Sequence, residues 1–125
     1  MSFGKKKQIL VIEDEPALNE AYKLILDNQG YDVLSAYNGE EALEILKQAT
    51  PSLLLLDLRM PKLDGIGFLK KYKPVGKKPR IIIFSNFDMQ KEIEQAYSLG
   101  ADRYILKSWA SPRELISIVK ESLAA

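Results

Sequence analysis

Four short runs in which almost every residue is apolar constrain this chain more than any other feature. They span residues 9–12, 53–56, 81–84 and 104–106. A β-strand reads as uninterrupted apolar sequence when both of its faces are buried, as in a parallel sheet covered by helices. Residues 31–36 alternate more weakly, as an edge strand does. These five segments therefore predict a parallel sheet with helices on both faces.

The stretches between these runs carry apolar residues at helical spacing. Five helices are predicted: from Pro16 to Gly30, from Asn38-Gly39 to Thr50-Pro51, from Asp64-Gly65 to Tyr72, around Ile93 to Gly100, and from Ser111-Pro112 onward. Five strand–helix repeats in 125 residues predict an α/β, flavodoxin-like (βα)5 fold. We expect a doubly wound, parallel five-stranded sheet in the order 2-1-3-4-5. A closed eightfold barrel would need about twice the length.

The chain contains neither cysteine nor histidine. This excludes disulfides, thiolate chemistry, a Ser-His-Asp triad and histidine-ligated transition metals, so any bound metal should be a hard cation. The net charge of +1 indicates no nucleic-acid partner, and no apolar run has membrane-spanning or signal-peptide character. We therefore predict a soluble, cytoplasmic protein: residues 1–7, with Lys5-Lys6-Lys7, form a flexible basic tail, and residues 8–125 form one domain.

Polar residues follow the predicted strands at the points where the apolar runs end. They are Glu13, Asp14, Asp57, Ser85 and Lys107. Ligands of doubly wound sheets bind beyond the carboxyl ends of the strands, so these side chains should line one crevice. Converging carboxylates repel one another unless a cation intervenes, and an oxygen-only cluster suits Mg²⁺. The set therefore predicts a Mg²⁺-dependent site in which Asp57 attacks a phosphoryl group, with Lys107 and Ser85 stabilising its oxygens.

Each of these residues also has an ordinary structural interpretation. Asp14 or Glu15 could cap the first helix, and Ser85 could cap the fourth. Lys107 alone would be a solvated surface charge, and Tyr104 would be a packing residue. The proposed nucleophile could be a simple loop acid at a strand end. The joint pattern favours the functional interpretation, because four strand ends all supply groups suited to one reaction.

With these residues, the sequence resembles the receiver domain of two-component response regulators over residues 8–123. The motifs that carry the resemblance are Glu13-Asp14, Asp57-Leu58-Arg59-Met60-Pro61 followed by Asp64-Gly65, Ser85, and the segment from Gly100 to Lys107. The resemblance implies that Asp57 accepts phosphate from a histidine kinase or a phosphotransfer protein. It also implies that Asp14 ligates Mg²⁺ directly, Glu13 ligates it mainly through water, and Asp57 and the backbone carbonyl of Arg59 complete the protein ligands.

The resemblance further implies a signalling switch rather than a conventional enzyme, although the domain would catalyse its own phosphorylation and dephosphorylation. Lys107 would pair with the phosphoryl group, Ser85 would hydrogen-bond to it, and Tyr104 would turn inward as Ser85 moves. The conformational change would reach the face made by the fourth helix, fifth strand and fifth helix, where we predict homodimerisation or partner binding. The chain ends with the fifth helix, which predicts a stand-alone regulator or an excised receiver.

Three departures from the family pattern bear on how the site works. Lys107-Ser108 replaces the usual Lys-Pro, so a trans bond is expected, because a cis bond before a non-proline costs about 3–4 kcal/mol. The loss of proline could displace Lys107. Asn86 stands where a small residue is usual and could crowd the phosphoryl group. Arg59 and Phe87 occupy positions that tune phosphate lifetime in the family, so altered dephosphorylation is predicted.

Three other functions remain open from the sequence. A flavin-binding module on this fold needs a phosphate-cradling loop after the first strand, whereas residues 13–15 are all acidic. A phosphatase with an aspartate nucleophile would need a second acid two residues later, where Arg59 stands. A degenerate receiver that binds partners without phosphorylation is compatible with Ser108 and Asn86.

Overall fold

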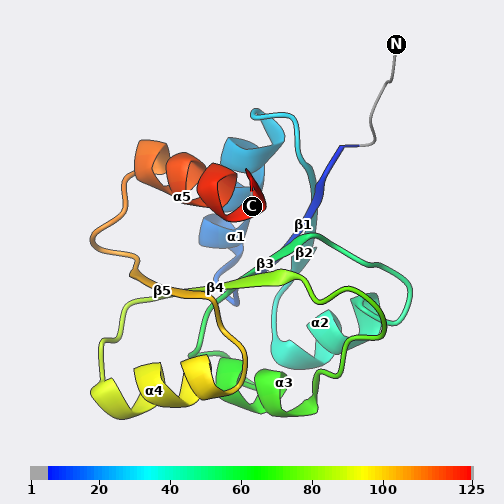
Figure 1. Ribbon diagram of the computed structural model, residues 1–125. Coiled ribbons are helices and arrows are strands. Elements are labelled where there is room, and N and C mark those ends of the chain that lie inside the picture. The colour runs from blue at the N-terminus through cyan, green and yellow to red at the C-terminus, as the bar shows by residue number, and fades with distance from the viewer. Residues whose placement is uncertain (1–5, 125) are drawn as a thin grey trace.

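Strands and helices alternate along residues 6–124, the part of the chain that the computed structural model describes. The strands are β1 (Gln8–Ile12), β2 (Asp32–Ala36), β3 (Leu53–Leu56), β4 (Arg80–Ser85) and β5 (Arg103–Leu106). The helices are α1 (Pro16–Asp27), α2 (Gly39–Ile45), α3 (Gly65–Lys71), α4 (Gln90–Ser98) and α5 (Pro112–Ala124). All strand pairs are parallel and the order is β2-β1-β3-β4-β5, which confirms the predicted topology (Figure 1).

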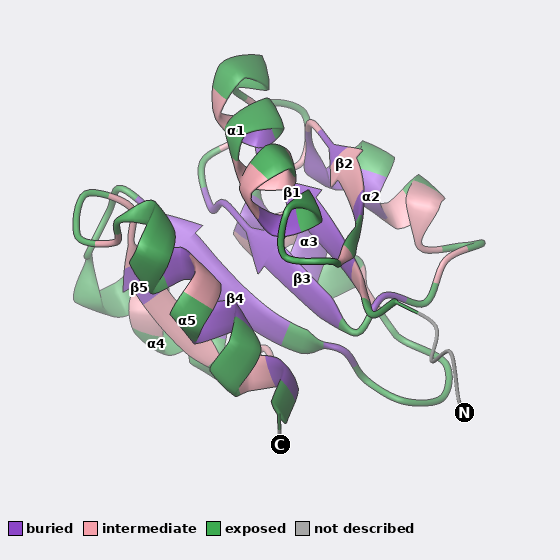
Figure 2. Ribbon diagram, turned by 90° about the horizontal axis from the view of Figure 1, so that it is seen from above, coloured by how far each residue is buried: buried purple, intermediate pink, exposed green. Residues whose placement is uncertain are grey.

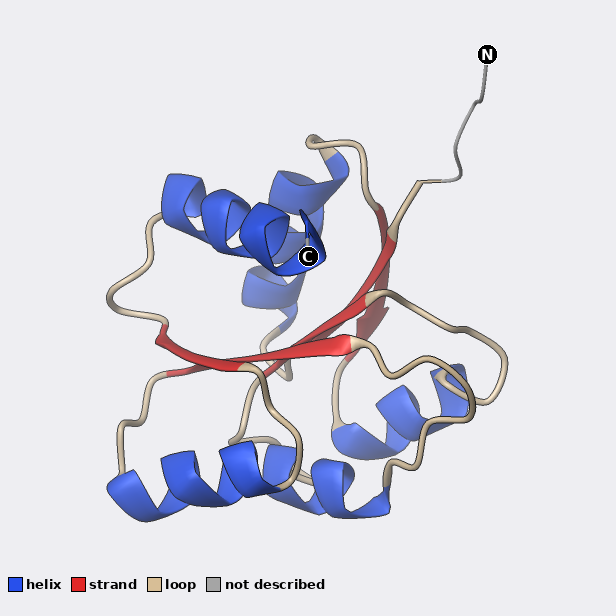
Figure 3. Ribbon diagram, in the orientation of Figure 1, coloured by secondary structure: helices blue, strands red, loops and turns tan. Residues whose placement is uncertain are grey.

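The sheet separates two hydrophobic cores. Helices α1 and α5 cover one face, and α2, α3 and α4 cover the other (Figure 3). Successive residues of a strand point to opposite faces, so Ile9 and Val11 join the first core while Leu10 and Ile12 join the second. The central strands are buried at nearly every position, as Figure 2 shows. This two-sided burial is why the strand sequences lack polar alternation.

Side-chain caps determine where several helices begin. The Asn38 side chain accepts a hydrogen bond from the Glu41 backbone at the start of α2, and Asp64 caps α3 through the Gly67 N–H. The predicted cap of α5 is confirmed, because Ser111 Oγ accepts a hydrogen bond from the backbone N–H of Glu114 at 3.2 Å. The N-cap residue of α1 is Glu15, but its side chain makes no capping hydrogen bond.

The register of the sheet brings the polar strand ends together. Ile12 pairs with both Ala36 and Leu56, and Ser85 pairs with Leu106. The residues that follow Ile12, Leu56 and Leu106 therefore emerge at the same edge. Gly65 lets the loop after β3 pack against this edge, because a Cβ atom there would lie 2.6 Å from the Asp57 carbonyl oxygen.

Residues 1–5, which include most of the predicted basic tail, lie outside the described part of the chain. Lys7 is bonded to the domain: its carbonyl accepts a hydrogen bond from Asp32 N at 3.0 Å, and its Nζ donates to the Leu123 carbonyl at 2.8 Å. Within residues 6–124, no helix combines the length and the apolar character that crossing a bilayer requires.

Candidate functional site

Three carboxylates meet at the carboxyl edge of the central strands. The backbone ladder continues one residue past each strand, since Glu13 N donates to the Ala36 carbonyl and Asp57 N donates to the Ile12 carbonyl, both at 3.0 Å. This holds Glu13 and Asp57 in place, and Asp14 follows directly. One carboxylate oxygen from each of the three lies within 4.8 Å of the others. The structure therefore brings together the acidic residues that were predicted to meet.

Lys107 reaches this acidic cluster from the end of β5. Its backbone N–H donates to the Ser85 carbonyl at 2.8 Å. Its ammonium group forms an ion pair with Glu13 and lies 3.3 Å from Asp57 Oδ2, and all three side chains are at least nine-tenths buried. No peptide bond within residues 6–124 is cis, so the Lys107–Ser108 bond is trans, as predicted. The absence of proline at position 108 does not displace Lys107 from the site.

Burial and charge together shift the ionisation of these groups. Burial raises the pKa of Asp57, and the Lys107 ammonium and the Arg59 backbone N–H oppose this shift. Burial also raises the pKa of Glu13, against the hydrogen bond from Lys107. For Lys107, burial favours the neutral amine, but the carboxylates of Glu13 and Asp57 outweigh it and raise the pKa. Keeping the carboxylates of this cluster ionised therefore costs free energy, and a further cation would reduce that cost.

The donor set fits a small divalent cation. Three carboxylates face one ammonium group, which leaves a local charge of −2 when all are ionised. The Asp14 side chain is only half-buried, and among the described residues its carboxylate forms no ion pair. Oxygen ligands with room for water on one side are what Mg²⁺ prefers. Glu13, Asp14 and Asp57 could therefore hold Mg²⁺ through their side chains.

Ser85 lies at the end of β4 and is completely buried. Its Oγ accepts a hydrogen bond from the backbone N–H of Phe87 at 3.3 Å. It does not cap the following helix, since α4 begins only at Gln90 and its N-cap residue is Met89. The alternative interpretation of Ser85 as a helix cap is therefore wrong. The hydroxyl instead connects the strand end to the loop that leads to α4.

The Arg59 side chain bridges the loop after β3 and the start of α4. Its backbone N–H donates to Asp57 Oδ1 at 3.3 Å. Its guanidinium forms an ion pair with Glu92 and lies 4.5 Å from the centre of the Phe87 ring, a cation–π arrangement. Asn86, at the first position after β4, is exposed to solvent. The Arg59 and Phe87 side chains, whose positions the resemblance predicted to affect dephosphorylation, thus contact each other.

Tyr104 is half-buried on β5 and packs against the core beneath α2, α3 and α4. Its hydroxyl donates a hydrogen bond to the Phe87 carbonyl in the loop between β4 and α4. Burial raises the pKa of this phenol. Tyr104 is therefore both a packing residue and a direct contact of the loop that follows Ser85.

Asn19 is a further site residue that the sequence reasoning missed. It is fully buried on α1, and its side-chain NH₂ group donates to the carbonyls of Glu13 at 2.9 Å and Ala36 at 3.0 Å. These bonds tie α1 to the backbone that presents the acidic pair. Helical spacing indicates that Asn19 is on the buried face of α1, because it lies seven residues before Leu26, the other buried residue of this helix. A polar residue on the apolar face of a helix indicates a buried hydrogen-bonding role of this kind.

Replacing Asn19 by Ala is expected to lower the free energy of unfolding by about 2 kcal/mol, because two buried carbonyls lose the hydrogen bond from the Asn19 NH₂ group and a cavity forms. Urea denaturation followed by circular dichroism measures this change. Asn28→Ala, at the exposed C-cap position directly after the same helix, should stay within about 0.5 kcal/mol of the wild type. Equal effects of the two substitutions would contradict the positioning role of Asn19.

Comparisons with known proteins agree on one family. The model of the response regulator receiver domain matches residues 9–120. A probable transcriptional regulator, ycf27, of Porphyridium aerugineum is 41% identical over 95% of this chain and 49% of that protein. The alkaline phosphatase synthesis transcriptional regulatory protein PhoP of Bacillus subtilis is 37% identical over 94% of this chain and 48% of that protein. The chain thus spans about half the length of these relatives.

A solved structure supports the same assignment. The CheY-like response regulator receiver domain protein of Methanospirillum hungatei superimposes with a TM-score of 0.90 at 28% sequence identity. The match covers 96% of this chain and 95% of that one. Both the sequence and the fold are therefore similar to receiver domains along nearly their whole length.

Proposed function

Because the chain belongs to the response regulator receiver domain family, we propose that it is a signalling switch that accepts a phosphoryl group on Asp57. One observation carries this proposal: the Lys107 ammonium is 3.3 Å from Asp57 Oδ2, inside a cluster of three carboxylates that fits a divalent cation. The geometry supplies a nucleophile, a positive charge for the incoming oxygens and ligands for Mg²⁺. The cluster would be an unfavourable arrangement for a purely structural role.

The proposed donor is a phosphohistidine on a histidine kinase or a phosphotransfer protein. A carboxylate oxygen of Asp57 forms a bond to phosphorus as the bond between phosphorus and the donor nitrogen breaks, and the released imidazole takes up a proton. Lys107 neutralises one phosphoryl oxygen. The Ser85 hydroxyl donates a hydrogen bond to another, once it no longer accepts the hydrogen bond from the Phe87 backbone N–H. Mg²⁺, when bound at Glu13, Asp14 and Asp57, supplies the charge that allows two anions to approach. The Arg59 carbonyl is proposed as its further ligand.

The output of the switch is proposed to pass through Ser85 and Tyr104. Movement of Ser85 toward the phosphoryl group would break its contact with Phe87, whose carbonyl now holds the Tyr104 hydroxyl. Tyr104 would then be free to turn inward, and the face formed by α4, β5 and α5 would change shape. Homodimerisation through that face and a cytoplasmic location stay predictions.

The test is incubation with Mg²⁺ and a small phosphodonor such as acetyl phosphate, followed by intact-mass measurement. The wild type should gain the mass of one phosphoryl group, and Asp57→Asn should gain none. Omitting Mg²⁺ should abolish the gain, and circular dichroism should show that both proteins are folded. An unmodified wild type with Mg²⁺ binding confirmed would favour the degenerate receiver instead, and modification of Asp57→Asn would place the acceptor elsewhere.

A further inference from the structure

The segment between the end of α3 and the start of β4 is strongly basic. Residues 70–80 contain six cationic side chains and no carboxylate: Lys70, Lys71, Lys73, Lys77, Lys78 and Arg80. The basic cluster predicted from the sequence was Lys5-Lys6-Lys7 alone. The fold places Lys7 beside the longer segment, because Lys7, Lys77, Lys78 and Arg80 line the same hollow. Two stretches about seventy residues apart in sequence thus form one basic surface.

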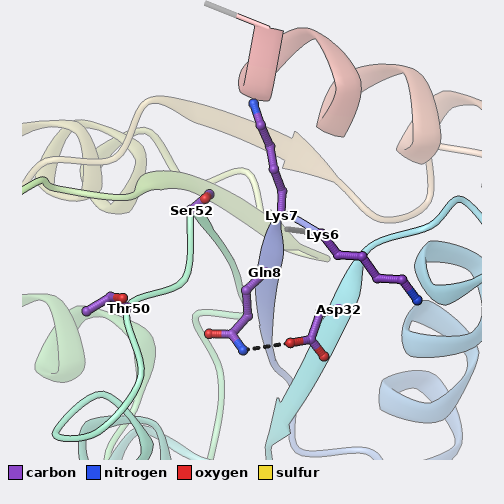
Figure 4. Close-up of a pocket in the computed structure, with 6 residues that line it drawn as sticks. All are labelled: Lys6, Lys7, Gln8, Asp32, Thr50 and Ser52. Carbon is purple, nitrogen blue, oxygen red and sulfur yellow. Dashed lines mark hydrogen bonds between the residues drawn. The ribbon is translucent and has the colours of Figure 1, made fainter. Parts of the chain in front are cut away.

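This surface is hollowed at the amino ends of the strands, opposite the carboxylate site. One depression of about 610 Å³ is lined by Lys6, Lys7, Gln8, Asp32, Thr50 and Ser52 (Figure 4). A second, of about 680 Å³, shares Lys7, Thr50 and Ser52 with the first and continues to the residues that precede β4. We call the two together the basic hollow. They offer a continuous concave surface rather than isolated lysines.

The positive charges of the basic hollow are only partly neutralised. Its lining contains five cations but only two carboxylates, Asp32 and Asp102. The Asp102 carboxylate accepts a hydrogen bond from Ile81 N at 2.8 Å and is 3.9 Å from Lys78 Nζ and 3.8 Å from the Arg80 guanidinium. The ammonium group of Lys7 binds the Leu123 carbonyl. This leaves Lys6 and Lys77 with no ion pair among the described residues, so an anionic ligand would meet cations that outnumber the carboxylates of the hollow.

The lining is also apolar in part. Val75 is 95% exposed, the largest exposure among the large apolar side chains of the described residues. Pro51, Pro79 and Leu123 line the same depression. A nucleic-acid backbone would present phosphates without an apolar group for Val75, and a flat anionic membrane does not match a concave surface. Carboxylates combined with an apolar side chain fit both parts of the lining.

We propose that the basic hollow docks an acidic polypeptide segment of a partner protein. Carboxylates of that segment pair with Lys6, Lys77 and neighbouring cations, and an apolar side chain between them packs against Val75. The hollow lies at the edge of the sheet opposite Asp57, so this docking needs no phosphoryl group. It would leave the acceptor site open to a phosphodonor while the partner is bound.

Fluorescence anisotropy with a labelled peptide of sequence Asp-Glu-Leu-Asp-Glu-Leu-Asp-Glu tests this proposal. Saturable binding that weakens with added salt is expected, and the double variant Lys6→Glu/Lys77→Glu should bind at least about tenfold more weakly. Both lysines are exposed, so the variant should fold.

The matched control Lys91→Glu/Arg113→Glu changes the net charge equally on the surface of α4 and α5, and it should bind as the wild type does. The Asp57→Asn variant should bind the peptide as tightly as the wild type does, whether or not Asp57 proves to be the phosphorylated residue.

Further arms separate the acidic polypeptide from other anions. Replacing the two Leu residues of the peptide by Ser, or Val75 by Ser in the protein, should weaken binding by about threefold or more. Equal loss of binding in both double variants would overturn the proposal, because only net charge would then matter. Absence of saturable binding, or tighter binding of duplex DNA or phosphatidylserine vesicles than of the peptide, would overturn it as well.

Discussion

Replacing Lys107 by Met is expected to lower the free energy of unfolding by about 3 kcal/mol near neutral pH. The substitution removes the ammonium group and leaves two buried carboxylates without their partner. Glu13 and Asp57 would then face each other with no cation between them, and both are at least nine-tenths buried. Urea denaturation in a metal-free buffer measures the loss. The same variant should accumulate far less phosphoprotein in the acetyl phosphate assay, since Lys107 neutralises the incoming oxygens in the proposed reaction.

The pH dependence of this effect has a definite sign. Because the pKa of Lys107 is raised in the folded protein, its stabilisation is fully present below the ordinary lysine pKa and is lost as pH rises through the raised value. At the acid end the difference between the wild type and Lys107→Met should shrink, because Glu13 and Asp57 take up protons. Their folded pKa values are already raised, so this shrinkage should begin above the ordinary carboxyl range.

Two controls separate the charge of Lys107 from its packing. Mg²⁺ should restore part of the stability lost in Lys107→Met, since a cation among the three carboxylates replaces the missing ammonium group. Lys120→Met, at an exposed position of α5, should change stability by no more than about 0.5 kcal/mol. A Lys107→Met protein as stable as the wild type without metal would show that the ion pairs with Glu13 and Asp57 contribute nothing.

Replacing Gly65 by Ala is expected to destabilise the domain by about 3 kcal/mol. A Cβ atom at this position would lie 2.6 Å from the Asp57 carbonyl oxygen and 2.8 Å from the Leu58 Cα. Both are backbone atoms of the segment that carries the proposed phosphoacceptor, so they cannot move aside without shifting Asp57. Thermal and urea denaturation measure the loss, and a slower phosphoryl uptake should accompany it.

Gly67→Ala provides the matched control in the same helix. Its Cβ would approach the Leu63 Cδ1 at 2.7 Å, the end of a flexible side chain that can rotate away. Alanine also favours the helix by about 1 kcal/mol relative to glycine, so Gly67→Ala should be nearly neutral or stabilising. If the two substitutions had equal effects, helix propensity rather than backbone approach would explain the need for glycine at position 65.

Much of the candidate site follows from the ends of the strands. In a parallel sheet whose strands are buried on both faces, the first polar residues after each strand must emerge at one edge. From the sequence alone, that rule predicts that one crevice is lined by Glu13, Asp14, Asp57, Ser85 and Lys107. The rule does not predict the role of Asn19, because that role depends on which carbonyls lie beneath α1. It does not predict the basic hollow either, because the hollow forms from two distant stretches of the chain.

The order of residues along the chain predicts the alternation of strands and helices, the parallel sheet and the set of polar residues at its carboxyl edge. These follow from local periodicity and from the need to bury apolar residues on both faces of a strand. The folded structure was needed to show that Lys107 reaches Glu13 and Asp57 without a proline after it. It also showed that the Arg59 guanidinium contacts Glu92 and Phe87. Such contacts depend on loop paths and side-chain directions in three dimensions, which residue spacing along a chain does not specify.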